Sequence, residues 1–242
     1  MNRIKVVQQA LGERAKPVYL EIGVSHGIAF RRIAADEKIA VDPALRLSAR
    51  SRRLADAKAP ATHYFETTSD AFFASQTAFL AERGIDVALI DGLHCYGQVV
   101  RDVENTLRYL RDDGVIVLHD CNPVTASIGF PATSYDDFRA HNRWRSLLCL
   151  TLPPWSGDVW KAIVHLRSTR DDLRIAVLKC DFGVGILRKG PPESRLSYSA
   201  AQIEALDYED FAADRERLLN LKPPAYFGEF LRRGVDSPRS SE

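Results

Sequence analysis

The chain has 242 residues, and its 33 lysines and arginines nearly balance 32 aspartates and glutamates, for a formal net charge of +1. This balance argues against nucleic-acid binding through bulk electrostatics, although a local basic patch is not excluded. The four cysteines are widely spaced without a CxxC pair, which excludes a zinc framework and a secreted disulfide scaffold. No segment has the apolar pattern of a signal peptide or membrane span, so we expect a cytoplasmic protein.

Short apolar runs alternate with amphipathic stretches through the first half of the chain. The runs that predict strands are 18–22, 39–41, 62–65, 87–90 and 115–118. Helices are predicted between them over 28–35, 48–57, 70–83 and 99–110, with Ser69 capping the third. Short apolar strands separated by helices are typical of a parallel sheet buried on both faces. The first half therefore predicts a doubly wound α/β fold.

The second half has a different character. Residues 122–156 are rich in proline, serine and aromatic side chains, with a weak helical pattern over 136–142, and we expect a lid or substrate loop there. Two β-rich runs, 173–178 and 183–187, follow a predicted helix at 158–166. Their connection is too short for a crossover helix, so they should form an antiparallel hairpin.

We predict a single domain spanning residues 1–242. Its last part, 197–242, is expected to be a helical extension that ends in a disordered tail.

A glycine-containing turn follows the first predicted strand, with the sequence Glu21-Ile22-Gly23-Val24-Ser25-His26-Gly27. Glycine lets the backbone approach a ligand, and a following helix would offer free N–H groups. The pattern is ExGxxxG and lacks the GxGxxG fingerprint of dinucleotide-binding folds. Asp42 ends the second strand, where a carboxylate can accept both hydroxyls of a ribose. Together the turn and Asp42 favour a ligand site over a purely structural turn.

The ordered series of motifs at the predicted strand ends resembles class I S-adenosylmethionine-dependent methyltransferases. It comprises the glycine turn, Val41-Asp42, Ser69-Asp70, Asp91-Gly92-Leu93-His94 and His119-Asp120. More narrowly, the sequence is similar to small-molecule O-methyltransferases of natural-product and sugar pathways, including macrocin-type enzymes and cephalosporin-hydroxylase-like proteins. The resemblance covers 18–122 and extends loosely to the hairpin. It implies a Rossmann-like, mostly parallel sheet of seven strands with an antiparallel C-terminal hairpin.

The resemblance also implies where S-adenosylmethionine binds. Its methionine half would be framed by Glu21, Gly23, Ser25 and Gly27. Asp42 would hold the ribose hydroxyls, and Ser69 and Asp70 would lie beside the adenine. Asp91 would face the transferred methyl group.

Carboxylates and imidazoles gather at the ends of the fourth and fifth strands. Such a set can hold a divalent metal such as Mg²⁺, with Asp91, His119 and Asp120 as the predicted ligands. Metal-dependent relatives have two neighbouring oxygen ligands after strand five, whereas this sequence has His119-Asp120-Cys121. Without metal, His94 or His119 is predicted to be a general base. Asp91, His94 and His119 are therefore the predicted catalytic residues.

We predict S-adenosylmethionine-dependent O-methylation of a hydroxyl on a small molecule of sugar or natural-product type, with metal assistance left open. The expected partner is this small-molecule acceptor, with no nucleic acid and no membrane, and a homodimer remains an option. The alternatives are a nucleotide-binding oxidoreductase on a doubly wound sheet, and a methyltransferase acting on RNA or protein. A non-catalytic scaffold is disfavoured by the intact Asp91, His94 and Asp120.

Overall fold

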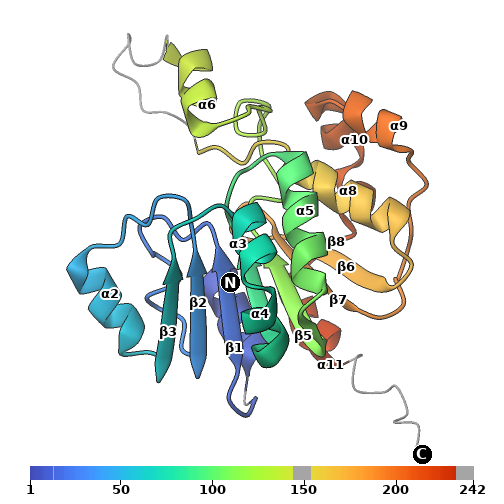
Figure 1. The fold of residues 1–242 in the computed structure, drawn as a ribbon. Helices are drawn as coiled ribbons and strands as arrows, with labels where there is room; N and C mark the ends of the chain where they lie inside the picture. Colours follow the sequence, from blue (N-terminus) through green and yellow to red (C-terminus); the bar gives the residue numbers. More distant parts are fainter. Residues whose placement is uncertain (13, 144–153, 233–242) are drawn as a thin grey trace, which may run out of the picture.

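The computed structural model describes residues 1–12, 14–143 and 154–232, and its strands form one sheet in the order β3-β2-β1-β4-β5-β7-β6-β8 (Figure 1). The strands are β1 Val18–Ile22, β2 Glu37–Val41, β3 Ala61–Phe65, β4 Ile85–Ile90, β5 Leu110–Leu118, β6 Leu173–Leu178, β7 Val184–Lys189 and β8 Leu221–Lys222. Only β7 runs antiparallel to its neighbours in this sheet. The predicted fold class is confirmed, and the short β8 adds an eighth strand to the predicted seven.

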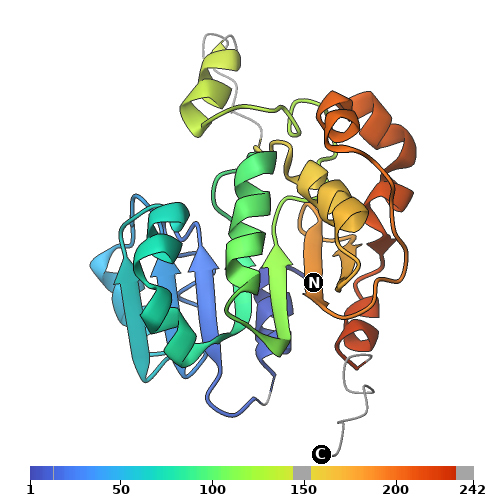
Figure 2. The ribbon, with the colours of Figure 1, turned by 45° about the vertical axis from the view of Figure 1, so that its right-hand side comes forward.

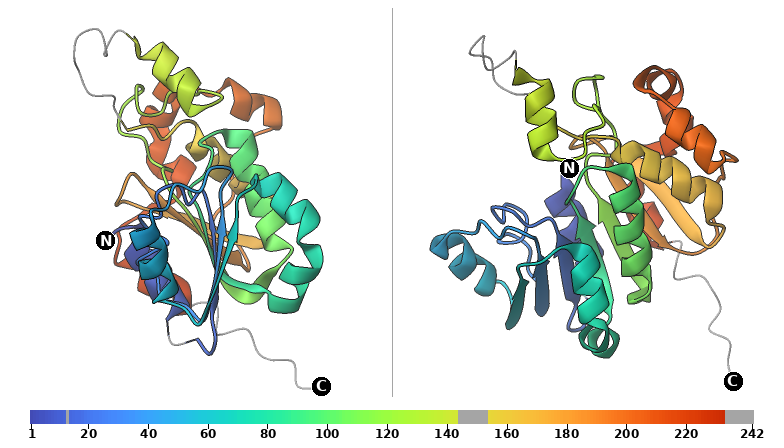
Figure 3. Two further views of the ribbon diagram at one scale, coloured as in Figure 1. Left: turned by 60° about the vertical axis from the view of Figure 1, so that its left-hand side comes forward. Right: turned by 45° about the horizontal axis from the view of Figure 1, so that its top comes forward.

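Helices cover both faces of the sheet. In the described residues they are α1 Arg3–Leu11, α2 Ala49–Asp56, α3 Ser69–Ser75, α4 Thr77–Arg83, α5 Tyr96–Leu107, α6 Tyr135–His141, α8 Val159–Thr169, α9 Ala200–Ala205, α10 Tyr208–Leu219 and α11 Tyr226–Arg232. Val87 and Leu89 of β4 belong to the core under α1, whereas Ala88 and Ile90 belong to the core under α5. This alternation makes both sheet faces apolar, and the edge-on view in Figure 3 shows α1 and α5 on opposite sides.

The strand pairing brings the carboxyl ends of four strands to one level. Ile22 of β1 pairs with Val41 of β2 and with Ile90 of β4, and Ile90 pairs with Leu118 of β5. The residues that directly follow these strands therefore emerge side by side at one edge of the sheet: Gly23, Asp42, Asp91 and His119. Helix α6 lies above this edge in Figure 1.

The predicted helix over 28–35 is wrong, because the segment between β1 and β2 is a series of turns. Its apolar spacing reflects real burial, since Phe30 and Ile33 are fully buried. The hydrogen bond that would join Phe30 and Ala34 in a helix is replaced by two other contacts. Lys38 Nζ donates to the Phe30 carbonyl at 2.6 Å, and the Ala34 N–H donates to Gln8 Oε1 at 2.9 Å. The glycine turn is therefore not followed by a helix N-terminus.

The predicted helix over 70–83 is divided into α3 and α4. Gln76 leaves the helical conformation, with φ −107° and ψ 28°. The residue that caps α3 is Thr68, whose side chain accepts the Ala71 N–H, so the predicted cap at Ser69 is off by one residue. Ser69 is instead the first helical residue and is buried.

Two predictions for the second half are confirmed in the described residues. β6 and β7 form the antiparallel hairpin, and α6 occupies the weak helical pattern. The helices α8, α9 and α10 gather at the β6 side of the sheet (Figure 2). Residues 144–153 of the expected lid and the tail from 233 lie outside the described residues.

The elements that were not predicted from the sequence are α1, α11 and β8. Among the helices that the structure describes, none combines the length and apolar character needed to cross a lipid bilayer.

Candidate active site

The glycine turn after β1 is held against the ends of β2 and β4. The Gly23 N–H donates to the Val41 carbonyl, and the Asp91 N–H donates to the Ile22 carbonyl, each at 2.9 Å. A Cβ atom on Gly23, which has φ +88°, would lie 2.2 Å from the Asp91 carbonyl oxygen. Only glycine therefore permits this close approach of two backbone segments beside the cavity described next.

A cavity of about 430 Å³ opens over the ends of β1, β2 and β4. Its lining includes six of the predicted cofactor residues: Gly23, Ser25, Asp42, Ser69, Asp70 and Asp91. Its volume falls within the usual range for small-molecule and cofactor sites, about 300–1,000 Å³. The structure thus brings these six residues together around a space of suitable size.

Asp42 is fixed by the backbone at the mouth of this cavity. Its Oδ2 accepts the Ser25 N–H at 2.8 Å, and its Oδ1 accepts the Ala44 N–H at 2.7 Å. Ser25 has φ +45°, in the left-handed region that few non-glycine residues adopt. A carboxylate has further lone pairs beyond these two bonds, so Asp42 keeps the capacity to accept ligand hydroxyls.

Two of the predicted cofactor residues, Glu21 and Gly27, are not part of the cavity lining. The Glu21 carboxylate is buried and accepts a hydrogen bond from the Tyr19 hydroxyl. Burial raises the pKa of Glu21 to about 8, against the opposing effect of this hydrogen bond. Gly27 has φ +69° and lies against Leu47. Both residues shape the turn from outside the cavity, and their contact with a cofactor stays a prediction.

Tyr135 and Trp155 complete the cavity from the segment that was expected to form a lid. The Trp155 ring stacks on Phe138 of α6 at a centroid distance of 5.5 Å, and its indole N–H donates to the Phe130 carbonyl at 2.9 Å. These contacts attach α6 to the cavity, and the role of this segment as a lid or substrate loop stays a prediction.

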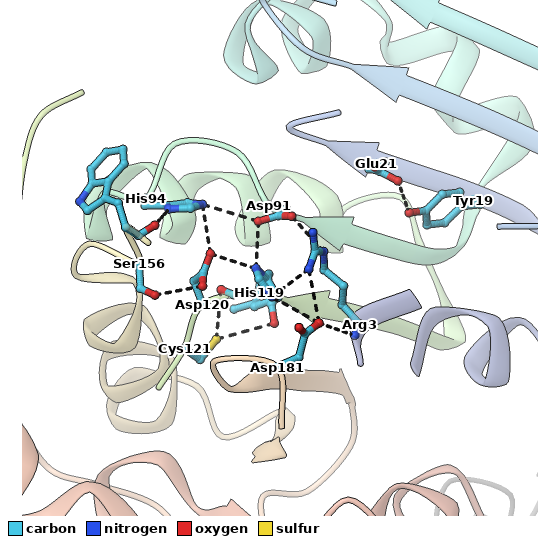
Figure 4. Close-up of polar contacts among 12 residues, drawn as sticks. Arg3, Tyr19, Glu21, Asp91, His94, His119, Asp120, Cys121, Ser156 and Asp181 are labelled. Atoms are coloured by element: carbon cyan, nitrogen blue, oxygen red, sulfur yellow. Dashed lines mark hydrogen bonds and ion pairs between the residues drawn. The ribbon is translucent and has the colours of Figure 1, made fainter. Parts of the chain in front are cut away.

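A cluster of charged side chains adjoins the cavity at the ends of β4 and β5 (Figure 4). Three of its carboxylates belong to Asp91, Asp120 and Asp181, and its nitrogen groups belong to His94, His119 and Arg3. Asp120 has φ +60°, which is a strained conformation for a non-glycine residue. Its Oδ1 accepts the Ser156 hydroxyl at 2.9 Å. Left-handed backbone at a non-glycine residue, as at Asp120, is characteristic of ligand and active sites.

His119 is enclosed by carboxylates. Its Nδ1 lies 2.9 Å from Asp120 Oδ2 and 3.2 Å from Asp91 Oδ1, and its Nε2 lies 3.4 Å from Asp181 Oδ2. Burial opposes protonation, but the hydrogen bonds to Asp120, Asp181 and Asp91 raise the pKa of His119 to about 11. Its Nε2 also lies 3.2 Å from Arg3 Nη1, which can only donate, so His119 has few lone pairs left for a substrate proton, and its role as a general base stays a prediction.

His94 has a more open arrangement at the same cluster. Its Nδ1 lies 2.6 Å from the Trp155 carbonyl oxygen, which can only accept, so Nδ1 carries the proton. Its Nε2 lies 3.5 Å from both Asp91 Oδ1 and Asp120 Oδ2. Burial lowers the pKa of His94, but the hydrogen bond to Asp91 and the charge of Asp120 outweigh it and the pKa is raised.

Ligand atoms of Asp91, His94 and Asp120 all lie within 4.8 Å of one another, a geometry compatible with a divalent metal. Two carboxylates and one imidazole are also a chemically suitable donor set for such an ion. The predicted ligand set contained His119 where the geometry offers His94. Both nitrogens of His119 already face charged groups, which is the physical reason for the difference.

A second cavity, of about 750 Å³, lies between the β6–β7 turn and α10. Its lining includes Asn122, Lys179, Asp181, Phe182 and Arg215. Asp181 also contacts His119, so this cavity borders the charged cluster from the β7 side.

Arg3, Ser156 and Asp181 were not anticipated from the sequence. Asp181 had a usable signal, because β7 is antiparallel to β5 and its start must lie beside the residues that follow β5. The structure shows this directly, since the Cys121 N–H donates to the Gly183 carbonyl at 3.0 Å. Arg3 had no such signal, because α1 precedes the first strand.

Comparisons with known proteins found a matching family model and solved structures to which this chain is similar. The family Methyltransf_24, described as a methyltransferase domain, matches residues 20–121. A proposed O-methyltransferase from Klebsiella pneumoniae is 15% identical, with a TM-score of 0.50 over 77% of this chain and 79% of that one. The methyltransferase PaMTH1 from Podospora anserina, bound to S-adenosylhomocysteine, is 13% identical, with a TM-score of 0.47 over 77% and 76% of the two chains. TomG from Streptomyces achromogenes, an O-methyltransferase of tomaymycin synthesis, is 12% identical, with a TM-score of 0.45 over 77% and 78%.

No curated protein matches the chain. The similarity to the Klebsiella pneumoniae protein concerns the fold, and the macrocin-type branch stays a prediction. Residues 20–121 therefore match a methyltransferase domain, and the Klebsiella pneumoniae protein shares the fold of the chain.

Proposed function

We propose that the protein transfers the methyl group of S-adenosylmethionine to a hydroxyl oxygen of a small polar molecule. The observation that carries this proposal is the position of Asp91. Asp91 lines the 430 Å³ cavity, and its Oδ1 lies 3.5 Å from Nε2 of His94. The Asp91 carboxylate thus lies beside both the cavity proposed for the methyl donor and His94, the candidate base.

The cavity lining suggests an orientation for the cofactor. Its ribose hydroxyls would be accepted by Asp42, and its adenine would lie near Ser69 and Asp70. The methionine half would lie along Gly23 and Ser25, which directs the sulfonium towards Asp91. A carboxylate at that point favours the positive sulfonium electrostatically, in agreement with ligand binding at the carboxyl ends of strands in open α/β sheets.

In the proposed reaction, Nε2 of His94 takes the proton of the acceptor hydroxyl while the oxygen attacks the methyl carbon. The carbon–sulfur bond breaks, its electron pair stays on sulfur, and the products are a methyl ether, S-adenosylhomocysteine and protonated His94. Asp91 and Asp120 stabilise that new charge. The Ser156 hydroxyl holds Asp120 in place at 2.9 Å. Collinear placement of donor and acceptor supplies the remaining acceleration.

A divalent metal fits the same residues, and Asp91, His94 and Asp120 would hold it. When bound, such an ion lowers the pKa of a coordinated hydroxyl group.

The part of the acceptor remote from the reacting hydroxyl would lie in the 750 Å³ cavity, which borders the charged cluster at Asp181. Its lining combines groups that donate and accept hydrogen bonds, among them Asn122 and Arg215, with the ring of Phe182, which is 39% exposed. Polar groups beside an exposed aromatic ring suit a hydroxylated ring compound such as a sugar. The expected small-molecule acceptor is consistent with this lining.

The test is transfer of a labelled methyl group. The full chain is incubated with S-adenosylmethionine carrying a ¹³C methyl and with a panel of glycosides, polyols and phenols, and products are identified by mass spectrometry and NMR. A ¹³C methyl ether formed by the wild type and lost in His94→Gln would support the proposal. Transfer to nitrogen or carbon only, or transfer undiminished in His94→Gln, would refute it.

A further inference from the structure

Arg3 brings a fixed positive charge into the cluster from outside the matched methyltransferase domain. Its Nε lies 3.2 Å from Asp91 Oδ2, and its Nη1 lies 3.4 Å from Asp181 Oδ2. An arginine side chain remains charged at all pH values relevant to proteins. The Arg3 side chain therefore contributes a positive charge to the cluster at every pH at which the protein is studied.

The position of Arg3 is fixed by its helix. The Arg3 backbone N–H donates to Asp181 Oδ2 at 2.9 Å, and the Asn2 side chain caps α1 by accepting the Lys5 N–H. Val6 and Val7 of the same helix are fully buried in the core. These contacts fix the backbone of Arg3, and the ion pairs with Asp91 and Asp181 hold its guanidinium in the cluster.

Arg3 and a divalent cation would compete for the same carboxylate. Oδ2 of Asp91 faces Arg3, while Oδ1 faces His94, and the Asp91 carboxylate belongs to the candidate metal-binding set. A cation at that set would be repelled by the nearby guanidinium, and it would bind a carboxylate whose charge is already partly neutralised. The repulsion is not strongly screened by salt, because the Arg3 side chain is only 21% exposed.

We propose that Arg3 is a specificity-determining residue that weakens divalent-metal binding at Asp91, His94 and Asp120. The Arg3 guanidinium supplies positive charge to the carboxylates of this cluster, in place of the charge that a metal ion would supply. The inference rests on the proposed function only in taking these three residues as the reacting centre.

The experiment measures Mn²⁺ binding to the purified full chain by electron paramagnetic resonance of the free ion. Arg3→Gln is expected to bind Mn²⁺ at least about tenfold more tightly than the wild type, because a full charge is removed at short range. Arg3→Lys, which keeps the charge, should stay close to the wild type. Arg14→Gln is the matched control, since Arg14 follows α1 but pairs with Asp113 and Asp86, neither of which belongs to the cluster.

Two further measurements localise the effect. Arg3→Gln combined with Asp91→Asn should lose the added Mn²⁺ affinity, because one ligand of the set is neutralised. S-adenosylhomocysteine affinity, measured in parallel, reports on the proposed function independently. If the wild type fails to bind S-adenosylhomocysteine, the proposed function fails, whereas the Mn²⁺ comparison still decides the role of Arg3.

The direction of the change separates an electrostatic role from a structural one. A loosened helix would leave Mn²⁺ affinity unchanged or reduce it, whereas the loss of repulsion increases it. Equal or weaker Mn²⁺ binding by Arg3→Gln, including no binding by either protein at millimolar ion, would overturn the proposal. An equal gain in Arg14→Gln would overturn it as well.

Discussion

Gly23 and Asp91 follow adjacent parallel strands, and their backbones approach so closely that a Cβ on Gly23 would lie 2.2 Å from the Asp91 carbonyl oxygen. The contact joins the turn that frames the cofactor cavity to the residue that leads into the charged cluster. Any displacement of one therefore displaces the other. The geometry of methyl transfer in our account depends on this junction.

Gly23→Ala should consequently damage both folding and cofactor binding. The added methyl group clashes with backbone rather than with a mobile side chain, and φ +88° is strained for alanine. We expect unfolding to become easier by about 1–3 kcal/mol and S-adenosylhomocysteine binding to be lost. Thermal unfolding and calorimetry measure these effects.

Gly97→Ala is the control, because the nearest atom to its added Cβ is 3.8 Å away. It should change stability by less than about 1 kcal/mol, as helix propensity predicts. Normal cofactor affinity in Gly23→Ala would show that the junction does not shape the site.

His94→Gln should separate chemistry from cofactor binding. Glutamine keeps a polar side chain but cannot take the acceptor proton at neutral pH. We expect kcat to fall by about 10²- to 10⁴-fold, which is the usual contribution of a general base. The affinity for S-adenosylhomocysteine should change little, because His94 is not part of the cavity lining. Steady-state kinetics and calorimetry on one preparation test this, and an unchanged kcat would remove His94 from the mechanism.

The pH dependence of the reaction should reflect the carboxylates around His94. As a base, His94 must be neutral, so activity should fall as pH drops through its pKa. Burial lowers this pKa, but Asp91 and Asp120 raise it above the ordinary histidine value. The acid limb in the pH profile of kcat/KM should therefore have its midpoint above the ordinary histidine pKa. Asp120→Asn should move this midpoint to lower pH. A limb that stays in place in Asp120→Asn would contradict the assignment of Asp120.

Glu21 should make stability depend on pH. Its pKa is about 8 in the folded protein, against an ordinary value of 4.5, chiefly because of burial. The stabilisation from its bound proton is complete below the unfolded pKa and is lost as pH rises through the folded pKa. Glu21→Gln should therefore flatten the decline of stability between pH 4.5 and about 8.

Chemical denaturation at a series of pH values tests this expectation. Glu82→Gln serves as the control, because the Glu82 side chain is 76% exposed. If Glu21→Gln and the wild type have parallel pH profiles, Glu21 does not titrate in this range.

The strand-end residues could be predicted because parallel strands place their carboxyl ends at one edge. Gly23, Asp42 and Asp91 each follow an apolar run directly, and the sheet brings them together without further information. The assignment of roles to His94 and His119 could not be made in this way. It depends on Asp181 and Arg3, which come from a hairpin turn and an N-terminal helix that are remote in sequence.

The failed helix at 28–35 has a tertiary cause. Its apolar spacing was real, but Lys38 takes the Phe30 carbonyl and Gln8 takes the Ala34 N–H. Both contacts come from residues outside the segment, and the sequence of 28–35 does not predict them. Local periodicity therefore predicted the burial of this segment correctly and its backbone conformation wrongly.

The measurement that tests the central claim most directly is calorimetric titration of the full chain with S-adenosylhomocysteine. We expect the wild type to bind S-adenosylhomocysteine with micromolar affinity. Asp42→Ala should bind at least about tenfold more weakly, because charged hydrogen bonds to the ribose are lost. Asp36→Ala, an exposed carboxylate directly before the other end of β2, should bind like the wild type. No binding by the wild type, or equal binding by Asp42→Ala in a folded state, would contradict the account.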